Sequence, residues 1–217
     1  MFLQIKLVNL RNHVNISGCV VCQMTTGIID HCTTQVAKGY AQRMTLIDPP
    51  PHSLSRTAFI NVYGSIYEHS PWVAATLYDS GLTETDRDPN HLAGRMAAIV
   101  NAGGAARQMA LLRAHPELAG KLAVAGKLTA DSTAEQASAG LDHCTQAEFD
   151  AFQNLNQRYS TTFGHPFIVA VRGLDREAIL AAFRRRVDND PAAEFETALG
   201  EVHKIARLRL AQLAAST

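Results

Sequence analysis

Arg209 is a cation at a position where the helical pattern calls for an apolar side chain. It follows Val202 by seven residues, which at about 100° per residue returns it to within about 20° of that apolar position. Arg207 faces the other side. A guanidinium among apolar side chains is costly unless it is paired. Arg209 is therefore either part of a structural ion pair or a clamp for an anionic ligand, to which it would present a planar fork of donors.

His115 stands where a helix is predicted to end, in the stretch Arg113-Ala114-His115-Pro116. The proline disfavours helical backbone at His115, so the imidazole lies on irregular backbone, where binding groups often occur. An imidazole titrates near neutral pH, which suits an acid or base catalyst. His115 is a candidate catalytic residue, with a structural histidine as the alternative. His69 is a weaker candidate, because the following Ser70-Pro71 marks a structural corner.

The stretch Ser132-Thr133-Ala134-Glu135-Gln136 has the spacing of a capping box, in which Ser132 and Glu135 satisfy the first amides of a helix. A helix start also offers free amides and the positive end of a dipole to a polar ligand. Glu135 and Gln136 would add acceptors and donors there. A Glu135 that contacts a ligand cannot also hold the amide of Ser132, so the two roles compete.

One apolar stretch reads as extended rather than helical: Phe167-Ile168-Val169-Ala170-Val171. A single short stretch cannot form a sheet. Its backbone groups, if buried, need partners from neighbouring loops or from a ligand. The stretch is therefore a candidate wall of a binding site.

The elements that must position these residues are helices. Apolar side chains recur with a helical period from about residue 52 onward, for example Phe59, Val62, Tyr63 and Ile66. Helix starts are indicated at Ser55, Ser70-Pro71, Asp88-Pro89, Thr145-x-x-Glu148, Asp175 and Asp190-Pro191. We expect an all-α fold, a single irregular domain of seven to nine helices over residues 44–217.

Composition separates a first segment from this domain. The chain has 217 residues, 47% of them apolar, and equal numbers of acidic and basic residues. Residues 1–43 hold four basic residues and one acidic residue, so they carry +3 and residues 44–217 carry −3. We expect residues 1–43 to be a disordered extension or a mis-assigned start, with Met44 as the true first residue. Neutral overall charge disfavours nucleic acid as a partner, and no apolar run is long enough to span a membrane.

Cysteines and missing motifs bear on metals and cofactors. Cys19, Cys22, His31 and Cys32 could ligate zinc, but their spacing is a weak signal. Residues 44–217 contain only Cys144, which fits a cytoplasmic protein without structural disulfides. The sequence has no HExxH, Walker A, GxGxxG or GxSxG motif. We therefore expect a reaction that needs neither a metal nor a cofactor.

Taken together, residues of about 50–213 resemble the 2-oxo-4-hydroxy-4-carboxy-5-ureidoimidazoline (OHCU) decarboxylase family of urate degradation. Each motif is weak singly, but in this order they are specific. The matching pieces are Tyr67–Ala74, His115–Gly120, Ser132–Gln136 running into Ala139–Leu141, Asn156–Val171 and Lys204–Leu210. His165 departs mildly from the pattern, because the family often has an apolar or aromatic residue there.

The resemblance implies an all-α homodimer that decarboxylates OHCU to (S)-allantoin without a cofactor. It implies that His115 is the catalytic acid, that Glu135 is its partner and that Arg209 holds an anionic or carbonyl oxygen. Gln136 would bond the ring or the ureido group. The remaining substrate-binding residues would be Pro116, Ser132, Thr133, Ala134, Phe167, Ile168, Val169, Ala170 and Val171.

Three alternatives remain open from the sequence. The first is a lyase for a related ureido or imidazoline acid on the same scaffold. The second is a helical interaction module without catalytic activity, which an inward-facing Arg209 argues against, because packing gains little from a buried charge. The third is a zinc-binding regulator that uses the cysteines of residues 1–43.

Overall fold

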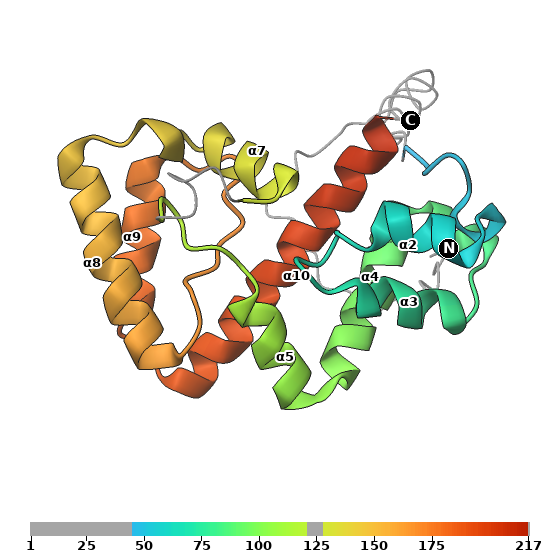
Figure 1. Ribbon diagram of the computed structural model, residues 1–217, viewed down its shortest axis with the longest axis horizontal. Helices are drawn as coiled ribbons and strands as arrows, with labels where there is room; N and C mark the ends of the chain where they lie inside the picture. The colour runs from blue at the N-terminus through green and yellow to red at the C-terminus, as the bar shows by residue number, and fades with distance from the viewer. Residues whose placement is uncertain (1–44, 121–127, 217) are drawn as a thin grey trace, which may run out of the picture. The chain divides into compact units, whose positions relative to one another are not determined.

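The computed structural model describes residues 45–120 and 128–216, and every described element is helical (Figure 1). The chain divides between Arg43 and Met44, and all described residues belong to the second unit. The possible zinc ligands at positions 19, 22, 31 and 32 lie outside the described residues. Within the described ranges there are eight α-helices and three short 3-10 helices (η), which confirms the all-α prediction. Their bounds are η1 Pro51–Ser53, α2 Arg56–Tyr63, α3 Pro71–Asp79, η2 Glu84–Arg87, α4 Pro89–Ala102, α5 Gly104–Arg113, α7 Ala130–Ser138, η3 Leu141–His143, α8 Gln146–Phe163, α9 Arg176–Arg186 and α10 Pro191–Ala215.

Most helix starts follow from the local sequence. The side chains of Ser55, Asp88, Asp175 and Asp190 each accept a hydrogen bond from an amide of the first turn that follows. Thr145 and Glu148 form the predicted capping box at the start of α8. These caps satisfy amides that have no partner inside the helix, and so they fix where each helix begins.

The start of α7 differs from the prediction. The helix begins at Ala130, and Thr129 is its N-cap, because the Thr129 hydroxyl accepts a hydrogen bond from the amide of Ser132 at 3.3 Å. The predicted capping box of Ser132 and Glu135 is therefore wrong. Both side chains lie within the helix instead, which leaves Glu135 free to bond another part of the chain.

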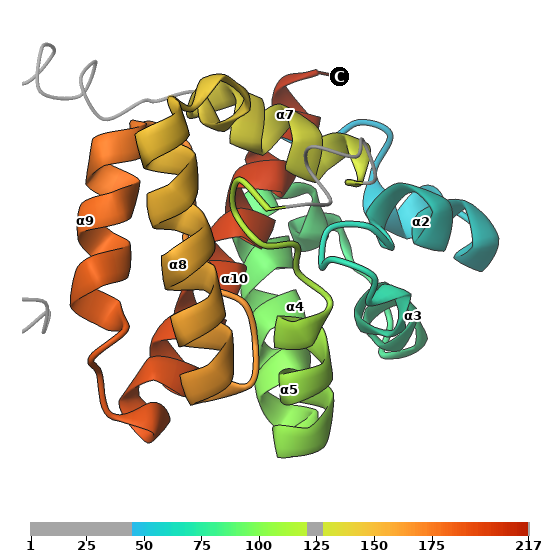
Figure 2. The same ribbon diagram turned by 60° about the vertical axis from the view of Figure 1, so that its left-hand side comes forward.

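Two apolar cores lie on either side of α10. The first packs α10 against α2, α3, α4 and α5 and includes Phe59, Leu92 and Val202. The second packs α8 against α9 through Phe152 and Phe183, and these two helices run side by side in both views (Figures 1 and 2). One prediction about the core is wrong: Val62 on α2, which belongs to the predicted apolar stripe, is 41% exposed.

The apolar segment 167–171 lies where the two cores meet. Ile168 is buried in the first core, whereas Phe167 and Val171 are buried in the second. The segment is neither helix nor strand, as predicted. Gly164 ends α8 with φ +72, a left-handed conformation that favours glycine and turns the chain back toward α10.

No helix among the described residues is long and apolar enough to cross a membrane.

Candidate functional site

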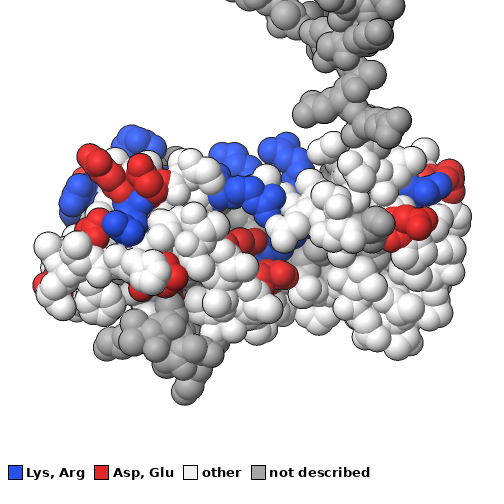
Figure 3. All heavy atoms as spheres, turned by 90° about the horizontal axis from the view of Figure 1, so that it is seen from above, with Lys and Arg blue, Asp and Glu red and all other residues white. Residues whose placement is uncertain are grey.

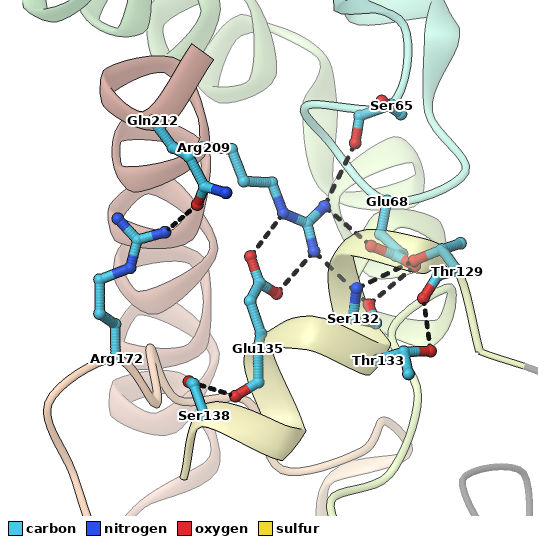
Figure 4. A network of polar contacts seen from close by, with 10 residues as sticks. All are labelled: Ser65, Glu68, Thr129, Ser132, Thr133, Glu135, Ser138, Arg172, Arg209 and Gln212. Carbon is cyan, nitrogen blue, oxygen red and sulfur yellow. Dashed lines mark hydrogen bonds and ion pairs between the residues drawn. The ribbon is translucent and has the colours of Figure 1, made fainter. Parts of the chain in front are cut away.

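Arg209 lies at the centre of a cluster of polar side chains, and it projects inward from α10 as its spacing predicts (Figure 4). The residue is only 7% exposed. Its Nε and Nη2 donate to the two carboxylate oxygens of Glu135, each at 2.8 Å. Its Nη1 donates to Glu68 Oε2 at 2.9 Å and to the Ser65 carbonyl at 3.2 Å. One guanidinium thus joins α10, α7 and the chain that follows α2.

The charges of this cluster do not cancel. Burial lowers the pKa of Arg209, but Glu135 and Glu68 outweigh burial and raise it, so the guanidinium stays charged. Burial raises the pKa of Glu68, but hydrogen bonds from Thr129 and Arg209 and the nearby Arg209 charge outweigh burial and lower it. Two carboxylates therefore share one cation, which leaves one negative charge uncompensated.

Glu68 is a site residue that sequence reasoning missed. It is 2% exposed and accepts hydrogen bonds from Thr129 Oγ1 at 2.7 Å and Ser132 Oγ at 3.1 Å, besides the one from Arg209. The adjacent His69 is exposed and has φ +46. This turn points His69 outward and Glu68 inward. The only sequence signal is an acidic residue at a helix corner next to Tyr67, which is also buried.

His115 is buried next to this cluster with one ring nitrogen fixed. Its Nδ1 lies 2.8 Å from the Leu111 carbonyl, which can only accept, so Nδ1 carries the hydrogen when the ring is neutral. Nε2 then holds a lone pair and has no protein partner among the described residues. Burial lowers the pKa of His115 to about 4, although the Leu111 carbonyl and Glu68 act in the opposite direction. The imidazole is therefore neutral at pH 7.

His115 and Glu135, which the resemblance implies to be partners, share no hydrogen bond in this structure. Glu135 directs both carboxylate oxygens at Arg209, and His115 bonds the backbone of α5 instead. The carboxylate whose charge raises the pKa of His115 is Glu68. Glu135 nevertheless lines the same cavity as His115.

Most of the predicted site residues line a single cavity between the two cores. Its walls are His115, Pro116, Leu118, Ser132, Glu135, Gln136, Phe167, Ile168, Val169, Ala170, Val171, Arg172, Ile205, Leu208 and Arg209. Thr133 and Ala134 are exceptions, because they are exposed on α7 and lie outside this cavity. The Gln136 side chain is engaged with the chain after α5: its Oε1 accepts from the Ala119 amide, and its Nε2 donates to the Glu117 carbonyl.

Two buried or half-buried side chains hold the segment 167–171 in the wall of this cavity. Arg186 Nη1 donates to the Ile168 carbonyl at 2.8 Å, and its guanidinium lies over the Phe167 ring at 4.5 Å. Glu201 on α10 accepts the Ala170 amide at 2.9 Å. The amides of Ile168, Val169 and Val171 have no protein acceptor within the described ranges. The segment therefore keeps backbone donors available for a ligand.

The chain is similar to proteins of one known family. A family model described as OHCU decarboxylase matches residues 52–211. The chain belongs to the OHCU decarboxylase family. It is 42% identical over 159 residues to a 2-oxo-4-hydroxy-4-carboxy-5-ureidoimidazoline decarboxylase of Haloferax volcanii, covering 73% of this chain and 90% of that protein. It is 38% identical over 166 residues to the protein of the same name from Bos taurus, covering 75% and 94%.

Solved structures related to the OHCU decarboxylase family share the fold. A crystal structure of (S)-allantoin synthase matches with a TM-score of 0.60 and 34% identity, covering 75% of this chain and 52% of that one. A crystal structure of OHCU decarboxylase in the presence of (S)-allantoin matches with a TM-score of 0.53, covering 66% and 91%. At 23% identity, the second match supports the fold alone.

In this member of the OHCU decarboxylase family, the described residues contain no group of three or more His, Cys, Asp or Glu side chains that could hold a metal ion. The groups that face the cavity are instead one imidazole, one carboxylate, two guanidinium groups, one hydroxyl, amides and apolar side chains. Such groups can bind a polar anion, orient it and move a proton.

Proposed function

We propose that this protein decarboxylates OHCU to (S)-allantoin in urate degradation. The observation that carries the proposal is the cavity in which His115, with a free Nε2, lies beside the buried Arg209 cluster and the amides of segment 167–171. The substrate name itself specifies a carboxylate, a hydroxyl and a ureido group on one small ring. The cavity offers a partner for each kind of group.

The chemistry that such a substrate needs is limited. The bond between C4 and the carboxylate breaks, CO2 leaves, and the electron pair forms a double bond to the neighbouring ring carbon, C5. The C5=N electrons move onto the ring nitrogen, which takes up one proton from solvent. C5 then receives a proton, while the 4-hydroxyl loses one and becomes a carbonyl. The ring itself accepts the electrons, so the residues of this chain have only to orient the substrate, stabilise the developing negative charge and move a proton.

His115 is the residue we assign to proton transfer. Because its Nδ1 is fixed by Leu111 and the ring is neutral, Nε2 first acts as a base and only then as an acid. The 4-hydroxyl of the substrate is one source of that proton. A single fixed nitrogen then returns the proton to one face of the ring, which accounts for a chiral product.

The other lining residues have supporting roles in this proposal. The free amides of segment 167–171 stabilise the developing oxyanion. The five N–H groups of Arg209 already face protein acceptors, so Arg209 reaches a substrate oxygen only if one of these acceptors, such as Glu135 or Ser132, gives up its bond. Gln136 would likewise exchange a bond to residues 117–119 for one to the ring or ureido group.

The test is decarboxylation of freshly generated OHCU, made with uricase and the hydrolase that follows it. We expect optically active allantoin to form faster than the spontaneous racemic background. His115→Asn should lose most of this activity, roughly a hundredfold or more, which is the usual contribution of a proton-transfer residue. His69→Asn is a matched control, because His69 is exposed and its φ of +46 is one that asparagine tolerates. Near wild-type turnover by His115→Asn would remove His115 from the mechanism.

We infer further that the protein is a homodimer, as the resemblance implies, and that it is cytoplasmic, since Cys144 is the only cysteine of residues 44–217. Light scattering of the full chain and cell fractionation would check the two statements.

A further inference from the structure

Two arginines line the cavity, and they differ in what they bond. Arg209 faces two carboxylates. Arg172 instead donates to the side-chain oxygen of Gln212 and, at 3.5 Å, to the Leu208 carbonyl, both on α10. Within the described part of the chain, Arg172 forms no ion pair. It is therefore a cavity-lining cation with only neutral partners.

Arg172 lies where the cavity opens to solvent. It directly follows Val171, the last residue of the buried segment, and is itself exposed. It lines the inner cavity and also an outer hollow, whose walls include Ser65, Asp131, Glu135, Arg209 and Gln212. In Figure 4, the Arg172 guanidinium reaches Gln212 on the side of Glu135 and Arg209 away from Glu68. A ligand that passes from the outer hollow to the inner cavity passes this guanidinium.

The positive charge of Arg172 acts on an anion that approaches the cavity. The inner cluster of Arg209, Glu68 and Glu135 keeps one uncompensated negative charge, which repels an anion that approaches from outside. The side of the molecule that carries α7 and the C-terminal end of α10 shows Lys and Arg side chains gathered near its middle, next to a few acidic ones (Figure 3). A cation at the opening offsets the repulsion, and steering of this kind acts over about 8–10 Å at ordinary ionic strength.

We propose that Arg172 binds the carboxylate of the incoming substrate at the opening of the cavity, and that it acts in substrate capture rather than in bond cleavage. The proposal rests on the proposed function, because it takes OHCU as the anion. The Gln212 amide is a partner that a carboxylate can displace, since a charged acceptor bonds a guanidinium more strongly than a neutral one.

The chemistry of decarboxylation predicts that this contact affects substrate binding more than the rate of the chemical step. The carboxylate loses its negative charge as CO2 forms, so a cation that holds it stabilises the bound substrate more than the transition state. Removal of Arg172 should therefore weaken binding without slowing the chemical step. A residue that merely supported the cavity would lower kcat as well.

The experiment compares Arg172→Met and Arg172→Lys with Arg207→Met in the full-length chain. Arg207 lies on α10, is exposed and lines neither cavity, so its loss matches the change in net charge. For Arg172→Met we expect KM for OHCU to rise roughly tenfold, as for one exposed charge-assisted contact, with kcat unchanged or higher. The KM of Arg172→Lys should lie between those of Arg172→Met and the wild type. Arg207→Met should leave KM unchanged.

A second readout separates carboxylate binding from cavity shape. Inhibition by (S)-allantoin, which has lost the carboxylate, should be the same in Arg172→Met and the wild type. KM for OHCU should also rise less steeply with salt in Arg172→Met. An unchanged KM, or an equal weakening for OHCU and allantoin, overturns the role of Arg172. Absence of turnover by the wild type overturns the proposed function, and this proposal with it.

Discussion

Arg209 both stabilises the fold through ion pairs and lines the cavity of the candidate site. Its spacing on the last helix predicted that it faces inward, and the structure confirms this with 7% exposure. Its partners could not be predicted, because Glu68 lies 141 residues away in sequence. The structure shows the ion pairs of Arg209 with Glu68 and Glu135, so contact with a substrate would require one of the acceptors of Arg209 to give up its bond.

Loss of the Arg209 charge should destabilise the protein. Arg209→Met leaves Glu68, which is 2% exposed, without its cation, and breaking a buried ion pair on one side costs about 3 kcal/mol. Adding Glu68→Gln should recover part of this loss. Denaturant unfolding would measure it, with Arg207→Met as the control that changes stability little. Equal stability of Arg209→Met and the wild type would contradict the expected dependence of Glu68 on this cation.

The buried imidazole of His115 should make stability depend on pH. Its pKa is about 4 in the folded protein against an ordinary 6.5, so between these values the unfolded chain binds a proton that the folded chain does not. Stability therefore falls as pH falls from 6.5 to 4. Burial also lowers the pKa of His165 and His203, which adds to the same trend.

His115→Gln isolates the contribution of His115 to this pH dependence. The slope of unfolding free energy between pH 6.5 and 4 should become shallower by up to about 1.4 kcal/mol per pH unit, the value for one proton. Urea unfolding at several pH values would measure it. A slope identical to that of the wild type would mean that His115 keeps its ordinary pKa in the folded protein.

At the scale of elements, one prediction from the local sequence is confirmed and another is wrong. The caps of α2, α4, α8, α9 and α10 depend on residues within one turn, and they are confirmed. The capping box of Ser132 and Glu135 failed because Thr129 stands one turn earlier and caps the helix first. Glu135 then turns to Arg209, a tertiary contact that offsets the burial of both groups.

Segment 167–171 was likewise predictable only in part. Its apolar, non-helical character was predictable, but its anchors on α9 and α10 were not. Glu201→Ala removes the acceptor of the Ala170 amide and should lower kcat/KM roughly tenfold by letting the wall of the cavity shift. Glu201→Gln keeps an oxygen in place and should stay near the wild type. Steady-state kinetics would test this, with melting temperatures measured to show that both variants are as stable as the wild type. Equal activity of Glu201→Ala and Glu201→Gln would exclude Glu201 as a positioning residue.

At the scale of the whole molecule, the charge boundary near Met44 coincides with other limits. The chain divides into two units between Arg43 and Met44, and the family match begins at residue 52. We expect a chain of residues 44–217 to keep the helical content and the turnover of the full protein. Circular dichroism and the OHCU assay would compare the two. A large loss of activity in the shorter chain would assign residues 1–43 a role in function.

The contacts of Arg209 also bear on the order in which the protein folds. They close loops of 141 residues to Glu68 and 74 residues to Glu135, whereas each helix forms from neighbours within a few residues. Contacts between residues far apart in sequence lose the most chain entropy and form late. Helices and local turns can therefore be complete while the reactive cavity is still open, and catalytic competence becomes the last property that a newly made chain acquires.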